Sequence, residues 1–166
     1  GGKKLISEFE DKNSNQYEKN AFYLYGLGLA HKHVPEILKW SGLDFAPLFV
    51  PSVGRFSQGM LVSVPLQLQQ LKNKVTSNEI HGVLEKHYLG QPFVNVEGLS
   101  RISEIVRLNP EGLNGSNMLN IYVFANDSSE QVVICAQLDN LGKGASGQAV
   151  QNLNLMLGLD ATTGLF

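Results

Sequence analysis

Residues 118–138 read MLNIYVFANDSSEQVVICAQL, and the fold can be worked out from this stretch outward. It contains two runs rich in β-branched and aromatic residues, Met118–Ala125 and Gln131–Leu138, a composition typical of strands. The short polar link Asn126–Glu130 separates them. We therefore expect two antiparallel strands joined as a hairpin.

A helix is predicted on each side of this hairpin in the sequence. Ser77–Leu89 follows a T-x-x-E capping box and ends before Gly90. Helical spacing predicts that its apolar face is formed by Ile80, Val83, Leu84 and His87. The second helix is Ala145–Leu157, which ends before Gly158. Its predicted apolar stripe is Ala149, Leu153, Met156 and Leu157.

The remaining elements are shorter. A third helix is expected near Pro35, whose missing N–H costs nothing in a first turn, and it should end at Gly42. Further strands are expected at Ala21–Gly28, Leu43–Val50, Met60–Leu68, Pro92–Val96 and Glu104–Leu108. Pro51–Gly59 is expected to be a loop, and Pro65 restricts its strand to a sheet edge. The fold class is α+β, with a mostly antiparallel or mixed β-sheet and helices packed on one face.

Composition limits the function. The 166 residues carry a net charge of −2, and Lys3-Lys4 is the largest basic cluster, so we expect no nucleic-acid partner. The apolar runs are too short to cross a bilayer, and no signal peptide opens the chain. With Cys135 as the single cysteine, internal disulfides are excluded and a cytoplasmic location fits. We expect residues 1–20 to connect to another part of a protein and residues 21–166 to form one domain.

The segment AHKHVPE contains the first candidate for chemistry. His31 and His33 are two residues apart, so in extended backbone they share a face, with Glu36 close behind. A histidine suits proton transfer at neutral pH, and a carboxylate can orient it. A surface loop before a helix explains the same pattern. A metal site is disfavoured, because no matching Cys or carboxylate cluster exists elsewhere.

Residues 138–152 contain the second candidate, a strand that runs through a glycine-rich turn with one lysine into a helix. Backbone N–H groups at a helix start attract anions and carboxamides, although the spacing is not that of a P-loop. The alternative is a tight connection in which glycines permit close packing. From Gly144 to Phe166 only Asp160 is charged, which favours a helix that lies against a partner.

Two further residues have simpler interpretations. Cys135 lies inside an apolar strand, where a free cysteine is commonly a small buried hydrophobe. Arg55 lies in the 51–59 loop, where it either grips a phosphate or carboxylate or is solvated.

Two stretches resemble the N-acetyl-gamma-glutamyl-phosphate reductases. Residues 31–37, HKHVPEI, are similar to that family's H-[RK]-H-x-P-E-I. Residues 139–152, DNLGKGASGQAVQN, are similar to its D-N-L-x-K-G-A-[AS]-G-Q-A-V-Q-N, and TTGL at 162–165 matches its tail. Gly115-Ser116-Asn117 also fits the family's layout, so the resemblance covers nearly the whole chain.

The resemblance implies the catalytic and dimerisation half of such an enzyme, with a fold like the C-terminal domain of glyceraldehyde-3-phosphate and semialdehyde dehydrogenases. Full members begin with a nucleotide-binding domain and a nucleophilic cysteine in an N-P-G-C-Y-like segment, and neither motif occurs here. The implied reaction is NADPH-dependent reduction of an acyl phosphate to a semialdehyde in arginine biosynthesis. The isolated chain is therefore expected to be inactive, to form homo-oligomers and to pair with its own nucleotide-binding domain.

The resemblance also implies roles for residues. His31 is the implied acid/base and Glu36 its support, while His33 and Arg55 are implied to bind substrate. The family's R-G pair is replaced here by Gln58-Gly59. The implied cofactor-facing residues, toward an NADP held mainly by the other domain, are Asn140, Lys143, Gly144 and Gln148. A non-catalytic dimerisation or small-anion binding module is the alternative, and an aldehyde-dehydrogenase-like relative is less favoured.

Overall fold

The computed structural model describes residues 3–165, and the chain forms two compact units, residues 1–57 and residues 58–166. The first unit contains α1 (Lys3–Glu10), β1 (Phe22–Leu24), α2 (His33–Ser41) and β2 (Ser52–Gly54). β1 and β2 pair antiparallel, and the buried ring of Phe9 stacks on Tyr23 beside them. The connecting role of residues 1–20 stays a prediction.

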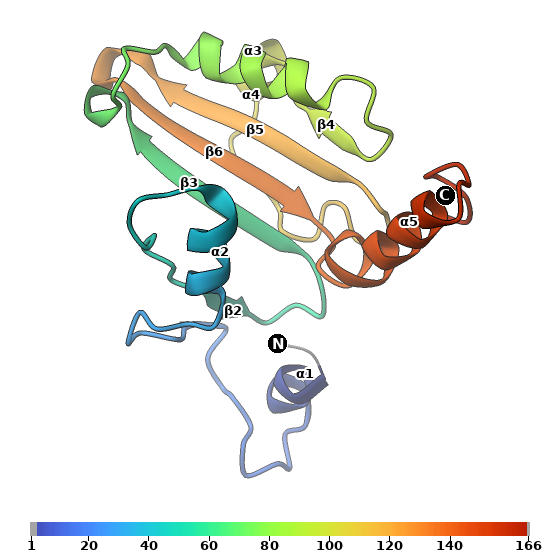
Figure 1. Cartoon of the computed structure of the whole chain (residues 1–166). Helices are drawn as coiled ribbons and strands as arrows, with labels where there is room; N and C mark the ends of the chain where they lie inside the picture. The colour runs from blue at the N-terminus through green and yellow to red at the C-terminus, as the bar shows by residue number, and fades with distance from the viewer. Residues whose placement is uncertain (1–2, 166) are drawn as a thin grey trace. The chain divides into compact units, whose positions relative to one another are not determined.

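The second unit is built on a four-stranded mixed sheet (Figure 1). Its strands are β3 (Met60–Gln67), β4 (Val94–Val96), β5 (Leu119–Asn126) and β6 (Gln131–Leu138), in the order β3-β6-β5-β4. The predicted hairpin is confirmed, because β5 and β6 pair antiparallel from Asn126–Gln131 to Leu119–Leu138. β4 runs parallel to β5. Pro65 lies in the edge strand β3, as predicted.

Successive residues of a strand point to opposite faces, so each face of this sheet has its own core. On one face Val123 and Val132 pack with Leu68, under Ile80 and Leu84 of α3 (Ser77–Tyr88). On the other face Tyr122 and Cys135 pack with Ile102 of the single-turn helix α4 (Leu99–Ile102). The α+β fold class is confirmed, and α4 adds cover to the face opposite α3.

The capping box of α3 is confirmed. Thr76 Oγ1 accepts the N–H of Glu79 at 3.2 Å, and the Glu79 carboxylate accepts the N–H of Thr76 at 2.8 Å. The predicted buried face of this helix is partly wrong, because Val83 is 68% exposed while His81 is buried. His81 donates through Nε2 to the carbonyl oxygen of Glu97 at 2.9 Å, which satisfies its buried ring.

The last helix begins differently from the prediction. A π-helical turn (Gly142–Ser146) leads into α5 (Gly147–Met156). The predicted stripe is exposed at Leu153, Met156 and Leu157, and the buried side chain of α5 is Asn154. Asn154 donates to the carbonyl oxygens of Ala161 and Thr163, so the tail turns back along this polar face of the helix.

Two predicted strands are absent. Residues 43–50 have no regular structure, since Pro47 has no N–H to donate to a ladder. Residues 104–108 are also irregular, and Ile105 and Leu108 pack onto the sheet beside α4 instead. The predicted loop 51–59 contains β2, which pairs with β1. The short polar link Asn126–Glu130 forms a 3-10 turn (Asp127–Ser129).

Candidate functional site

The turn before α2 positions the two histidines. Gly26 adopts φ +64°, where a side chain would be strained, and Leu29 follows at φ +57°. The N–H of Leu29 donates to the carbonyl oxygen of Gly26, which closes the turn. The chain then enters α2 at His33, with Glu36 in the first turn, where the helix dipole favours a negative charge.

His31 lies half-buried among aromatic rings of the first unit. Its ring centroid is 5.1 Å from that of Phe49, 5.9 Å from that of Tyr25 and 4.9 Å from that of His33. Its Nδ1 accepts the backbone N–H of His33 at 3.2 Å. The imidazole therefore has a defined orientation and is not sealed in a hydrophobic interior.

Glu36 pairs with His33. His33 Nδ1 donates to Glu36 Oε2 at 2.7 Å, and the two side chains are 47% and 63% exposed. A carboxylate that holds one imidazole nitrogen orients the ring and leaves the other nitrogen for proton transfer. The structure thus brings His31, His33 and Glu36 together, and the carboxylate contacts His33 where the resemblance implied His31.

Arg55 forms its hydrogen bonds with other residues of the first unit. Its guanidinium donates to the Tyr17 hydroxyl at 3.3 Å and to the Glu18 carbonyl oxygen at 2.6 Å. It also lies over the rings of Phe9 and Tyr17. These contacts tie residues 9–18 to β2 and use two of the five guanidinium N–H donors.

Asp139 organises the turn that leads into α5 in the second unit. It is 2% exposed and accepts the N–H groups of Gly115, Leu141 and Gly142 together with the Gln58 amide. Burial alone would raise the pKa of Asp139, but these hydrogen bonds outweigh burial and lower its pKa below the ordinary value. This carboxylate is consequently a fixed anion that holds backbone.

The side chain of Asn140 forms a hydrogen bond through its oxygen atom. Its Oδ1 accepts the N–H of Gly59 at 2.7 Å. Gly59 has φ +108°, and a Cβ there would clash with the Pro110 carbonyl oxygen, so glycine is required. Among residues 3–165 no other group pairs with Asn140, which leaves its amide N–H groups as donors.

Lys143 points into the protein. It is 8% exposed, donates to Gln151 Oε1 at 2.9 Å and lies 5.6 Å from the centre of the Phe93 ring. Asn117 donates to the same oxygen of Gln151. Burial lowers the pKa of Lys143. The ammonium therefore braces the π-helical turn against α5.

The other two predicted cofactor contacts lie at the surface. Gly144 is exposed, and Gln148 is half-buried with its amide donating to Asn152 at 3.0 Å. A cavity of about 410 Å³ opens at the start of α5, lined by residues 115–117, Asp139, Leu141-Gly142, Ser146-Gly147 and Gly164-Leu165. None of the four predicted cofactor contacts is among the lining residues. The uncharged helix α5 therefore contributes Gly147 to the cavity lining. Two of its side-chain amides, those of Gln148 and Asn152, are hydrogen-bonded to each other.

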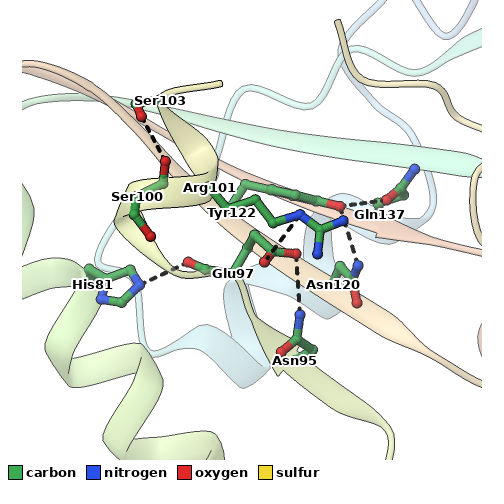
Figure 2. Close-up of polar contacts among 9 residues, drawn as sticks. All are labelled: His81, Asn95, Glu97, Ser100, Arg101, Ser103, Asn120, Tyr122 and Gln137. Atoms are coloured by element: carbon green, nitrogen blue, oxygen red, sulfur yellow. Dashed lines mark hydrogen bonds and ion pairs between the residues drawn. The ribbon is translucent and has the colours of Figure 1, made fainter. Parts of the chain in front are cut away.

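A separate polar cluster crosses β4, β5 and β6 (Figure 2). Tyr122 donates to Gln137 at 2.8 Å, and Gln137 donates to the Asn109 carbonyl oxygen. Glu97 is nearly buried and lies 3.7 Å from Arg101. The sequence interpretation missed this cluster, since its members are spread over more than 50 residues and share no local pattern. It ties the segment between β4 and β5 to the sheet.

Two further findings concern metals and membranes. Within residues 3–165 no three or more His, Cys, Asp or Glu side chains are placed to hold a metal ion. The helices in that range are all too short or too polar to cross a bilayer.

Cys135 is buried, as its apolar strand predicted, and its sulfur lies 3.6 Å from the Ser63 hydroxyl.

Comparison with known proteins gives a consistent family. A family model described as semialdehyde dehydrogenase, dimerisation domain, matches residues 1–140. The chain is 49% identical over 158 residues to the N-acetyl-gamma-glutamyl-phosphate reductase of Brucella suis, which covers 95% of this chain and 51% of the relative. The reductases of Brucella ovis and Brucella canis match to the same extent. The resemblance inferred from the motifs is confirmed, and the chain spans about half the length of these relatives.

Proposed function

Because this chain belongs to the semialdehyde dehydrogenase dimerisation-domain family, we propose that it is the catalytic and dimerisation half of an NADP-dependent N-acetyl-gamma-glutamyl-phosphate reductase. The substrate is an acyl phosphate, which is converted to N-acetyl-glutamate semialdehyde and phosphate. A cysteine thiolate from the part of the relatives outside this match attacks the acyl group. NADPH, when bound, supplies the hydride.

The contribution of this chain is to handle protons at the reacting oxygen. The observation that carries the proposal is the 2.7 Å contact between His33 and Glu36, with the His31 ring 4.9 Å away. An imidazole oriented by a carboxylate is the usual arrangement for general acid–base work near neutral pH. Because both side chains are largely exposed, a substrate can reach them.

The turn into α5 supports a role toward the cofactor. Asn140 offers an amide N–H that nothing in the described chain accepts, and a carboxamide or carbonyl oxygen would match it. Gly144 and Gln148 lie at the surface nearby in the chain and fit the same role. The buried ammonium of Lys143 fits it less well, so we assign this lysine to holding the turn.

Substrate binding by Arg55 and His33 stays a prediction. The contacts of Arg55 with Tyr17 and Glu18 favour a structural task for that arginine. His33 is accessible and can contact the substrate while it exchanges a proton.

An exposed apolar surface at the end of α5 indicates where a protein partner would bind. The end of α5 exposes Leu153, Leu155, Met156 and Leu157, which would lie against the protein's own nucleotide-binding domain or a second copy. The same surface favours the second candidate function, a dimerisation module without chemistry. A cytoplasmic location stays a prediction.

The test compares the 166-residue chain with a longer protein that joins it to a nucleotide-binding half. Each is assayed for NADPH oxidation with N-acetyl-glutamyl phosphate, and its mass is measured by sedimentation. We expect the chain alone to self-associate without turnover and the longer protein to be active. Turnover by the chain alone, or an inactive and correctly folded longer protein, would contradict the proposal.

A further inference from the structure

The ladder between β3 and β6 ends beside the turn that leads into α5 (Figure 1). Its last pair is Met60 with Leu138, so Gly59 lies where the next antiparallel pair would form. There the N–H of Gly59 donates to Asn140 Oδ1 at 2.7 Å, a side-chain acceptor in place of a backbone carbonyl oxygen. The Asn140 side chain is therefore bound directly to the end of the sheet.

This hydrogen bond determines which way the Asn140 amide points. A carboxamide has an accepting oxygen and a donating nitrogen, and a half-turn about its Cβ–Cγ bond exchanges the two. A backbone N–H can bind only the oxygen, so the contact with Gly59 directs the nitrogen Nδ2 away from the sheet. In the part of the chain that the structure describes, Nδ2 has no acceptor. The turn thus presents a donor to a ligand.

Gln58 holds Gly59 in this position. The Gln58 amide donates to Asp139 Oδ2 at 2.9 Å, and its carbonyl oxygen accepts the Asn114 amide at 3.1 Å. Asp139 is buried and is itself fixed by three backbone N–H groups, so it is a rigid anchor for Gln58. Gly59 also passes so close to the Pro110 carbonyl oxygen that only glycine fits there.

We propose that Gln58 and Gly59 are positioning residues for the turn into α5: together they hold Asn140 with Nδ2 directed outward before any ligand binds. This inference rests on the proposed function for the identity of the ligand, an acceptor oxygen of NADPH. A side chain that is already oriented avoids the entropy cost of being ordered on binding, which corresponds to about 3–10-fold in affinity.

The first test uses NMR of the 166-residue chain to measure the scalar coupling between the Gly59 backbone nitrogen and the Asn140 side-chain carbonyl carbon. We expect this coupling in the parent chain. Gln58→Leu should weaken or abolish it, whereas Gln58→Arg should keep it, because a guanidinium also donates to the Asp139 carboxylate. Three backbone donors to Asp139 remain in both variants, so both should fold. No coupling in the parent, or an unchanged coupling in Gln58→Leu, overturns the inference.

The second test titrates NADPH into the longer protein and follows its fluorescence. Gln58→Leu should raise the Kd for NADPH by about 3–10-fold, with kcat at saturating NADPH close to that of the parent, and Gln58→Arg should restore the Kd. Ser77→Ala is the matched control, since it removes a 2.7 Å hydrogen bond to Asp127 at the opposite end of the β5–β6 hairpin. An unchanged Kd in Gln58→Leu, or the same rise in Ser77→Ala or Gln58→Arg, overturns the inference.

Asn140→Ala distinguishes a failure of this inference from a failure of the proposed function. If this variant binds NADPH as tightly as the parent, the proposed contact of Asn140 with the cofactor fails, and the coupling measurement still decides whether Gln58 positions the side chain. If Asn140→Ala weakens binding and Gln58→Leu does not, the proposed contact stands and the positioning role fails.

Discussion

Two helices of this protein begin with ionisable side chains, and they use them in opposite ways. At the start of α2, His33 and Glu36 are exposed and paired. At the turn into α5, Asp139 and Lys143 are buried, and each is satisfied by groups that do not titrate near neutral pH. The start of α2 and the turn into α5 both lie in the stretches that resemble the reductases.

The difference separates chemistry from architecture. An exposed imidazole–carboxylate pair loses little hydration and can exchange a proton with a ligand. A buried charge costs several kcal/mol of hydration, which only a full set of hydrogen bonds offsets. We infer that the turn before α2 acts on substrate, whereas the turn into α5 holds backbone so that Asn140 and Gly144 are presented.

The largest effect is expected from a substitution that breaks the exposed pair of His33 and Glu36. His33→Asn in the longer protein should lower kcat by about 10²–10⁴, since general acid–base help is lost. The free energy of unfolding should barely change, because the side chain is exposed. Steady-state kinetics would measure the first quantity and denaturant titration the second. His87→Asn is the matched control, and equal kcat values for the two variants would contradict the role of His33.

The next largest effect is expected from a substitution of Asp139, which holds the turn into α5. Asp139→Ala leaves the N–H groups of Gly115, Leu141 and Gly142 without their acceptor. We expect the free energy of unfolding to fall by about 2–4 kcal/mol. Urea titration of the 166-residue chain would measure it, with the exposed Glu104→Gln as a control expected to change by less than about 0.5 kcal/mol. A loss as small as that of the control would make Asp139 dispensable.

The smallest expected effect concerns buried Lys143 and the pH dependence of the free energy of unfolding. Burial lowers the pKa of Lys143 below 10.5, so between the two values the unfolded chain binds more protons than the folded chain. Stability therefore rises with pH across that window, and the charged lysine opposes folding below it. Lys143→Met removes this buried charge, so the variant should be more stable than the parent chain near neutral pH.

The check is thermal and urea unfolding of both proteins at several pH values. The advantage of the Met variant should shrink as the pH approaches 10.5. An advantage that does not depend on pH would show that packing, and not the charge, causes it.

Local signals predicted the central hairpin and the capped helix, whereas the strands expected at 43–50 and 104–108 are absent. The capping box at Thr76 and Glu79 and the β5–β6 hairpin each arise from residues close in the sequence, and both are confirmed. Periodicity located α3 and α5 but assigned the buried face of α3 only partly correctly and that of α5 wrongly. His81 and Asn154 are buried because they bond to distant carbonyl oxygens, and no helical pattern encodes those partners.

The candidate site was predicted in part. The spacing of His31, His33 and Glu36 indicated that they lie together, and the structure places them so. Which histidine the carboxylate contacts depended on the helical turn from residue 33 to 36, while Nδ1 of His31 accepts the backbone N–H of His33. Arg55 was predicted from its residue type alone, and its contact with Tyr17, 38 residues away, could not be inferred.

By itself, the sequence determined the family, the strand hairpin, the capped helix and the group of ionisable residues before α2. Only the tertiary structure decided that Glu36 holds His33, that Lys143 points inward and that Asp139 gathers four donors. The physical reason is range. Helix caps and hairpins form between near neighbours in the chain, whereas the burial of a charge and the identity of its hydrogen-bond partners depend on segments that meet only after folding.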